Sequence, residues 1–248
     1  MPDSGAMSRI GEGPMRSMRS LLAVVFAMIS AASPLLAAEQ TVVLQPSADT
    51  TIRSATRGGL NTNYGTEATL EVRPTSRTLI RFDLDPLLAQ YGPEAGLVSA
   101  AVEINATAAS GWPTGGTPVE IRPVTVAWTE LGATWNCPID TNLANEAPDC
   151  ATQWAGGTSG GITSSVVHTN STSGIQSYNV LADVGAMVGG GPNYGWILQL
   201  PTLVASDSLV TYRSNQGPPL ARPPLRVVYD SDVVAPGLQW VRPSTYFL

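Results

Sequence analysis

Arginine is the residue type best suited to ligand chemistry in this chain of 248 residues, because all 13 basic residues are arginines and lysine is absent. A guanidinium group binds a carboxylate through two parallel hydrogen bonds, and an exposed aromatic ring can lie against the apolar face of a sugar. An alternative for the arginines is surface charge that keeps the edges of a β protein soluble. Tyr64 and Trp112 lie in predicted loops and are the aromatic residues expected to be exposed. The candidate ligand-binding residues are Arg53, Tyr64, Arg73, Arg81, Trp112 and Arg213.

A second kind of site would bind a metal ion. Carboxylate and carbonyl oxygens are the ligands that Ca²⁺ prefers, so one loop rich in such groups is a candidate for a structural calcium site. The spacing is not that of an EF-hand, and the alternative is that these residues form turns through their own side chains. Apart from this ion, the sequence predicts no cofactor. The candidate ligands are Asp140, Asn142, Asn145 and Asp149, with Asn61 and Asn63 as further candidates in an earlier predicted loop.

The two cysteines, Cys137 and Cys150, are predicted to form a disulfide, because an even pair close in sequence is typical of an exported protein. The bond would close a loop of about 14 residues and contribute roughly 3 kcal/mol in the chain-entropy model. The loop shows no strand pattern, so the disulfide would hold a segment that burial alone does not.

Catalytic arrangements receive less support than binding. The single histidine, His168, would have to serve any Ser–His–Asp triad, yet no Gly-x-Ser-x-Gly motif surrounds a serine, and we expect a solvated loop histidine. A glycoside hydrolase needs two carboxylates, for which Asp83, Glu103 and Glu120 are available, but these lie on the polar faces of predicted strands. We therefore assign no catalytic residue.

The first 38 residues have the pattern of an export signal. Arg16 and Arg19 precede an apolar stretch over residues 21–38, which ends in small residues that suit a signal peptidase. The stretch is short for a membrane span and is interrupted by Pro34, so cleavage is expected in preference to anchoring, with no membrane span afterwards. Residues 1–14 do not fit this pattern and are expected to be an upstream extension. The predicted location is secreted, at the cell surface or in the periplasm.

Alternating apolar and polar residues predict an all-β fold. The clearest alternation covers residues 97–108, which we expect to form a central antiparallel strand. A broken strand is predicted over 125–136, and at most one short helix, over 180–188. Strands about ten residues apart with turns between them favour an antiparallel β-sandwich of the jelly-roll type over residues 39–230. The other predicted strands are 68–73, 78–84, 119–122, 194–200, 209–213 and 225–229.

The net charge and the C-terminal residues both indicate which partners the protein can bind. The net charge of −6 argues against nucleic acid, because phosphate binding requires a basic surface. Residues 231–248 form an apolar C-terminal tail that contains Trp240, Tyr246 and Phe247. We expect this tail to fold back as an extra strand or to mediate self-association by pairing with a second copy.

The order of several short motifs resembles that of a known family. DTTIR at 49–53, NTNYG at 61–65, LIRFDL at 79–84, VSAAVEI at 98–104 and PPLRVVY at 223–229 follow one another along the chain. This order resembles the disaggregatase-related domain, also called the DNRLRE domain, and is similar to a carbohydrate-binding module group with alginate-binding members. The resemblance covers residues 41–230 and implies a jelly-roll sandwich in an exported protein.

Together with the arginines, the resemblance implies a non-catalytic protein that binds an acidic or cell-surface polysaccharide. The first alternative is a structural or adhesive protein of an extracellular matrix or surface assembly, which the apolar tail favours. The second alternative is a polysaccharide lyase or hydrolase.

Overall fold

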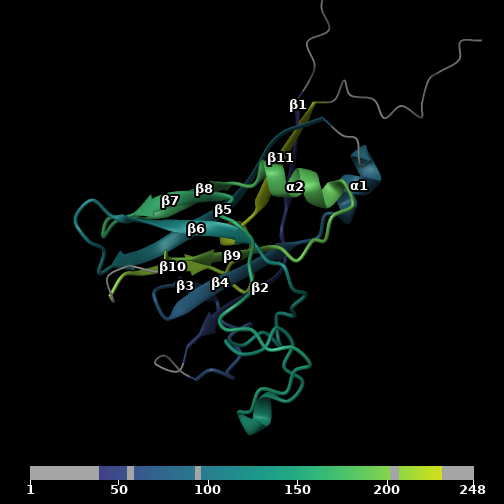
Figure 1. Ribbon diagram of the computed structural model, residues 1–248. Helices are drawn as coiled ribbons and strands as arrows, with labels where there is room; N and C mark the ends of the chain where they lie inside the picture. The colour runs from purple at the N-terminus through teal and green to yellow at the C-terminus, as the bar shows by residue number, and fades with distance from the viewer. Residues whose placement is uncertain (1–38, 55–58, 93–95, 202–206, 231–248) are drawn as a thin grey trace, which may run out of the picture. The chain divides into compact units, whose positions relative to one another are not determined.

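The computed structural model describes residues 39–54, 59–92, 96–201 and 207–230. These residues form two antiparallel β-sheets that pack face to face around a hydrophobic core (Figure 1). The all-β sandwich predicted from the sequence is confirmed. The predicted export signal at 1–38 and the apolar tail at 231–248 lie outside the described residues, so self-association through the tail stays a prediction.

Sheet A is organised around one long strand. Its strand order is β1–β11–β5–β10–β3, and β8 also pairs with β5. The central strand β5 pairs with β11 over residues 96–102, with β8 over 101–106 and with β10 over 106–110. The segment with the clearest alternation is therefore the central strand, as predicted. The strands of sheet A are β1 (Glu39–Leu44), β3 (Thr69–Val72), β5 (Gly96–Ser110), β8 (Gly174–Asn179), β10 (Leu209–Arg213) and β11 (Leu225–Asp230).

Sheet B has the strand order β2–β4–β9–β6–β7. From β1 to β6 each strand lies in the opposite sheet from the one before it, which is the kind of connection expected for a jelly roll. Its strands are β2 (Pro46–Arg53), β4 (Ser76–Phe82), β6 (Thr117–Pro123), β7 (Ser164–His168) and β9 (Trp196–Gln199).

Two short α-helices accompany the sheets. α2 (Leu181–Val188) is the helix predicted over 180–188, and it turns Val184, Met187 and Val188 into the core. The expectation of at most one short helix missed α1 (Asp85–Tyr91), which has a proline in its first turn and begins where the Asp83 carboxylate accepts the Asp85 N–H at 3.0 Å. Within the described ranges, no helix is long and apolar enough to cross a membrane.

The main core lies between the two sheets. Ile80 and Phe82 of β4 and Val102 and Ile104 of β5 are fully buried in it, together with Trp196 of β9. Burying each such side chain contributes about 1.5–3 kcal/mol, so the alternation read from the sequence is also the main source of stability.

A second core covers the outer face of sheet B. The connection between β6 and β7, teal in Figure 1, packs over that face and places Trp128 and Trp154 against Leu79 and Ile197. The predicted broken strand over 125–136 is wrong: this segment turns instead of pairing, because its apolar side chains fill the second core.

A buried carboxylate joins β2 to two connections. Asp49 is 1% exposed; its Oδ2 accepts the Asn215 N–H at 2.6 Å, and its own N–H donates to Glu130 Oε1 at 3.1 Å. Burial raises the pKa of Asp49 to about 7, although the Asn215 hydrogen bond lowers it; repulsion from Glu130 adds to the rise, and the charge of Arg222 opposes it. The ionised form is therefore costly in the folded protein at neutral pH.

Asp49→Asn is predicted to raise the free energy of unfolding at pH 8. Because the folded protein holds the Asp49 proton more tightly than the unfolded chain, this group makes wild-type stability fall as the pH rises from about 4 to about 7. The asparagine side chain carries no charge at any of these pH values, so the variant does not lose this stability as the pH rises. In urea denaturation, the gain from the substitution should be larger at pH 8 than at pH 5, by about 1–3 kcal/mol. An equal gain at both pH values would contradict the burial argument.

Candidate functional site

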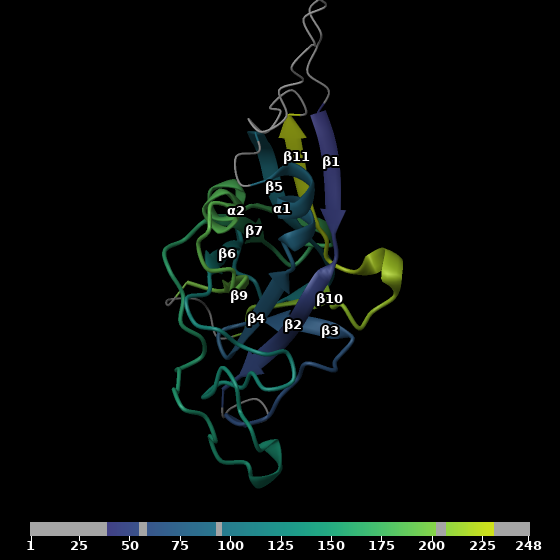
Figure 2. The same ribbon diagram turned by 90° about the vertical axis from the view of Figure 1, so that its right-hand side faces the viewer.

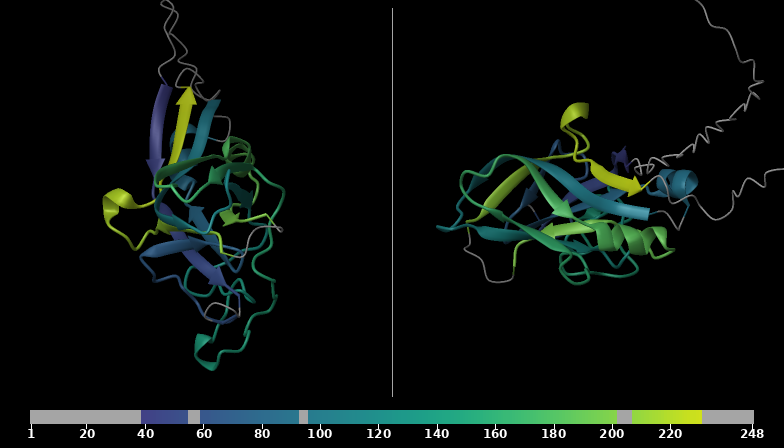
Figure 3. Two further views of the ribbon diagram at one scale, coloured as in Figure 1. Left: turned by 90° about the vertical axis from the view of Figure 1, so that its left-hand side faces the viewer. Right: turned by 90° about the horizontal axis from the view of Figure 1, so that it is seen from above.

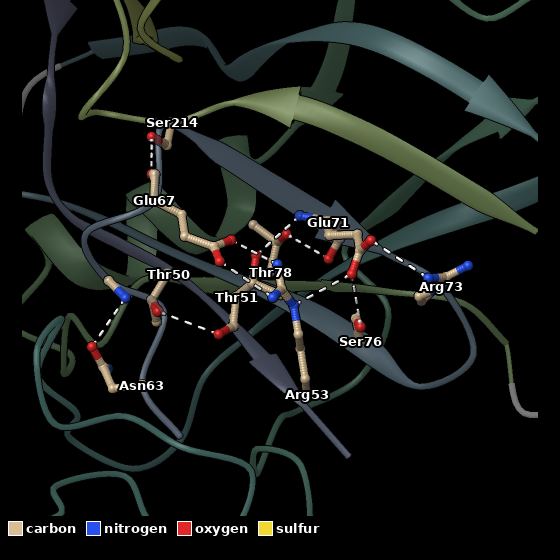
Figure 4. A network of polar contacts seen from close by, with 11 residues as sticks. Thr50, Thr51, Arg53, Asn63, Glu67, Glu71, Arg73, Ser76, Thr78 and Ser214 are labelled. Atoms are coloured by element: carbon tan, nitrogen blue, oxygen red, sulfur yellow. Dashed lines mark hydrogen bonds and ion pairs between the residues drawn. The ribbon is translucent and has the colours of Figure 1, made fainter. Parts of the chain in front are cut away.

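Two of the candidate ligand-binding residues, Arg53 and Arg73, lie close together where β2 and β3 adjoin (Figure 4), and a third, Tyr64, packs against Arg53. The Arg53 guanidinium carbon lies 3.9 Å from the centroid of the Tyr64 ring, and Arg53 Nη2 is 2.6 Å from Glu67 Oε2. Arg53 Nε is 3.4 Å from Glu71 Oε2, and Arg73 Nη1 is 3.6 Å from Glu71 Oε1. Glu71 of β3 therefore bridges Arg53 of β2 and Arg73, which follows β3 in the turn to β4.

These contacts serve the protein itself. The side chains of Arg53 and Glu71 are each 19% exposed and that of Arg73 is 9% exposed, and Glu71 Oε2 also accepts the Ser76 hydroxyl at 3.1 Å. Each such ion pair contributes about 1 kcal/mol or less, so the network's main effect is to satisfy polar groups along the edge of the sandwich. A ligand carboxylate would have to displace a glutamate to reach Arg53. The ligand-binding role of Arg53, Tyr64 and Arg73 stays a prediction.

The other three candidates lie apart from this network. Arg81 donates from Nη1 to Trp128 O at 3.2 Å, and its guanidinium carbon lies 5.3 Å from a Trp128 ring, so it supports the second core. The expected exposure of Trp112 is wrong: the residue is 4% exposed, and its Nε1–H donates to Leu209 O at 2.8 Å. A ring in this position cannot stack on a sugar. Arg213 is half-buried on β10, and its side chain has no hydrogen bond or ion pair with any described residue.

The cystine loop has the disulfide that the sequence predicts. Cys137 and Cys150 are bonded, with their Cα atoms 5.8 Å apart. The candidate calcium ligands lie in this loop and bond to it: Asn145 Nδ2 donates to Asp149 Oδ2 at 2.6 Å, and Asp140 Oδ1 accepts the Asn142 N–H at 3.0 Å. Over the ranges that the structure describes, no group of three or more His, Cys, Asp and Glu side chains is placed to hold a metal ion. Calcium in this loop stays a prediction.

The single histidine is not a solvated loop residue, as the sequence suggested, but the buried end of β7. His168 is 0% exposed; its Nδ1–H donates to Val166 O at 2.9 Å, and its Nε2 accepts from the Tyr212 hydroxyl at 2.7 Å. The Tyr178 hydroxyl continues the chain 3.3 Å from that of Tyr212. Burial lowers the pKa of His168, with the Val166 bond opposing, and burial raises the pKa of both tyrosines. This enclosed network is structural and offers no substrate access.

The buried histidine predicts acid sensitivity. Because the pKa of His168 is lower in the folded than in the unfolded protein, its contribution to stability is lost as the pH falls below about 6.5. Asp49 has the opposite slope, so the comparison is made between Asp49→Asn and the double variant Asp49→Asn/His168→Gln. Urea denaturation between pH 7.5 and 4.5 should show the steeper loss in the single variant, by about 1 kcal/mol. Parallel pH profiles would count against the role of His168.

A groove of about 300 Å³ opens on the outer face of sheet A, between the end of β10 and the start of β11. The chain leaves the sheet after Arg213 and forms the 3₁₀ turn η3 (Pro219–Ala221), which is the yellow coil beside β1 and β10 in Figure 2 and the same turn from two other sides in Figure 3. Two hollows of similar volume, beside α2 and beside the disulfide, have no arginine in their linings. The polar residues that line the groove are Gln45, Glu103, Asn105, Arg222 and Arg226.

Arg222 and Arg226 are not among the candidate ligand-binding residues predicted from the sequence. The signal that could have found Arg222 is the proline-rich segment at 218–224, which marks a connection that leaves the sheet. The signal for Arg226 is its place between the buried residues Leu225 and Val227, which turns its side chain to the outer face.

Residues 40–154 match the family model of Carbohydrate-binding module family 96. The matched segment begins within β1 and contains β2 to β6. It also contains the cystine loop and most of the connection that covers sheet B, and it ends before β7. It indicates a carbohydrate-binding, non-catalytic module, while the disaggregatase-related resemblance and an alginate ligand stay predictions. A search of curated proteins found none that matches the chain.

Proposed function

We propose that this protein is exported and binds an acidic polysaccharide without acting on it as a catalyst. The observation that carries the proposal is the match of residues 40–154 to a carbohydrate-binding module, on a fold whose described part is a β-sandwich. Such modules hold sugars on an exposed surface, so the open outer side of sheet A is the region of interest.

The acidic class of ligand is supported by the cations that this surface presents. Arg213, Arg222 and Arg226 all belong to the part of the chain that forms the outer side of β10, β11 and the connection between them. Arginine suits uronate carboxylates because its planar fork forms two parallel hydrogen bonds. Because the protein has a net charge of −6, an anionic polysaccharide is attracted close to these arginines and not by the molecule as a whole.

Export is supported by two independent features. The apolar stretch at 21–38 follows two arginines and ends in small residues, and the Cys137–Cys150 disulfide suits an oxidising compartment. A secreted, periplasmic or cell-surface location would also give the protein access to extracellular polysaccharide.

Affinity electrophoresis of the purified protein tests the function. In native gels that contain alginate or polygalacturonate, migration should be retarded relative to a gel without polymer, and the retardation should weaken with added salt because carboxylates are bound. A gel with neutral xylan should give little retardation. Parallel gels with calcium or with a chelator test whether a metal ion contributes.

Two outcomes would contradict the proposal. Equal retardation in neutral and acidic gels would refute the preference for an acidic ligand, and migration unchanged by every polymer would refute carbohydrate binding. Release of reducing ends or unsaturated uronate absorbance on incubation with the same polymers would refute the non-catalytic role.

A further inference from the structure

The floor of the groove is a paired arginine and glutamate. Arg226 of β11 and Glu103 of β5 meet in two contacts, Nε to Oε1 at 3.0 Å and Nη2 to Oε2 at 3.3 Å. The Arg226 side chain is 45% exposed and that of Glu103 is 19% exposed. This pair fixes the orientation of the guanidinium, and Arg226 Nη1 takes no part in either contact. A hydrogen bond from Arg226 Nη1 to a ligand therefore costs little side-chain entropy, because the guanidinium is already oriented.

The walls carry polar groups that the described part of the chain leaves without partners. The side-chain amides of Gln45 and Asn105 make no hydrogen bond with any described residue, and Arg222 Nε is buried without a hydrogen-bond partner. Most buried polar atoms in proteins are paired, and Arg222 Nε is an exception. Because this nitrogen is itself inaccessible, a ligand in the groove would reach the guanidinium through its terminal nitrogens. Planar amides and guanidinium groups are also suited to the paired hydroxyls of a sugar.

Apolar side chains complete the lining. Val43 is 46% exposed, Ile175 is 68% exposed and Leu220 is fully exposed, and these three come from β1, β8 and η3 on different sides of the groove. A pyranose ring has an apolar face of C–H groups, which can bury these aliphatic surfaces from water. The volume is at the lower end of the range of about 300–1,000 Å³ for small-ligand sites, which fits one sugar unit and part of its neighbour.

We propose that this groove is the ligand site and that it binds a uronate unit of an anionic polysaccharide. The uronate carboxylate pairs with Arg222, while Asn105, Gln45 and Arg226 hydrogen-bond to ring hydroxyls and Leu220 and Ile175 contact the C–H face. The lining carries two guanidinium groups and one carboxylate, and although Arg222 also interacts with Asp49, burial raises the pKa of that carboxyl to about 7 and so reduces its negative charge. A uronate balances the remaining positive charge and a neutral sugar does not. This assignment rests on the proposed function and goes beyond it by naming the site and its anchor.

Arg222→Gln tests the assignment, because it removes the proposed anchor charge and keeps a polar side chain. Affinity electrophoresis with the polyuronate that retards the wild type gives an apparent Kd for each variant. Arg222→Gln should weaken binding about tenfold or more, since a charge-assisted hydrogen bond in a partly enclosed site is lost. Arg222→Lys should fall between the two, because it keeps the charge and loses the bidentate fork.

Two matched substitutions locate the effect. Arg122→Gln removes the same charge from sheet B, where Arg122 pairs with Glu120 at 2.9 Å, and should leave the Kd close to that of the wild type. Arg213→Gln removes one positive charge from β10 of sheet A, at a residue outside the groove lining. Asn105→Ala gives a second, uncharged change within the groove and should also weaken binding. Thermal unfolding of each variant shows that losses of binding do not come from unfolding.

The outcomes separate the site from the function. If the wild type is retarded and both Arg222→Gln and Asn105→Ala bind as tightly as it does, the groove assignment is wrong and polysaccharide binding stands. A loss in Arg213→Gln alone would place the site on β10 instead. Absence of any retardation of the wild type would overturn the proposed function and the groove assignment together.

Discussion

Sheet B is buried on both faces over β2, β4 and β9, and much of the structure follows from this constraint. Its inner face meets sheet A, while Leu79 and Ile197 turn outward and are fully buried by the connection between β6 and β7. That connection has little regular secondary structure, so its backbone carbonyls need other partners. Asn63 is the partner of two of these carbonyls: its Nδ2 donates to Glu130 O at 2.7 Å and to Ala133 O at 2.8 Å. The disulfide then closes a loop of this connection in which residues 141–146 are all exposed.

The same constraint decides which arginines remain available to a ligand. Arg77 and Arg81 of β4 lie under the connection, where each donates to a backbone carbonyl and each lies over a tryptophan ring. Arg53 is held by glutamates at the edge of the sandwich. Arg77 and Arg81 therefore stabilise the connection that covers sheet B. The outer side of sheet A has no comparable cover in the described ranges, and there the polar side chains of β5, β10 and β11 face solvent.

The fold was largely predictable from the sequence, and the site was not. A period of two residues over 97–108 fixes which side of β5 meets the core, whatever its partners are. The period says nothing about a second layer outside the sheet, so the pattern over 125–136 predicts a strand where the chain instead fills the second core. Trp112 lies in a predicted loop, yet its ring is buried in the main core beside that of His168. The sequence also predicts the wrong environment for His168, because its buried side chain bonds to Tyr212, which lies 44 residues away. Contacts of this kind are set by tertiary packing, which local pattern does not contain.

The groove shows why a ligand site can be rigid although it lies on a connection. The chain crosses from β10 to β11 without following the sheet, and Glu103 N–H donates to Pro224 O at 2.9 Å where a neighbouring strand would otherwise bond. Prolines at 218, 219, 223 and 224 restrict the backbone on both sides of η3, so the segment that carries Arg222 has little backbone freedom before any ligand arrives. Less conformational entropy is then lost on binding, and a small groove without aromatic rings can still hold a sugar. A proline-restrained connection set into a gap between strands therefore performs the task that stacked aromatic residues perform on a flat sheet.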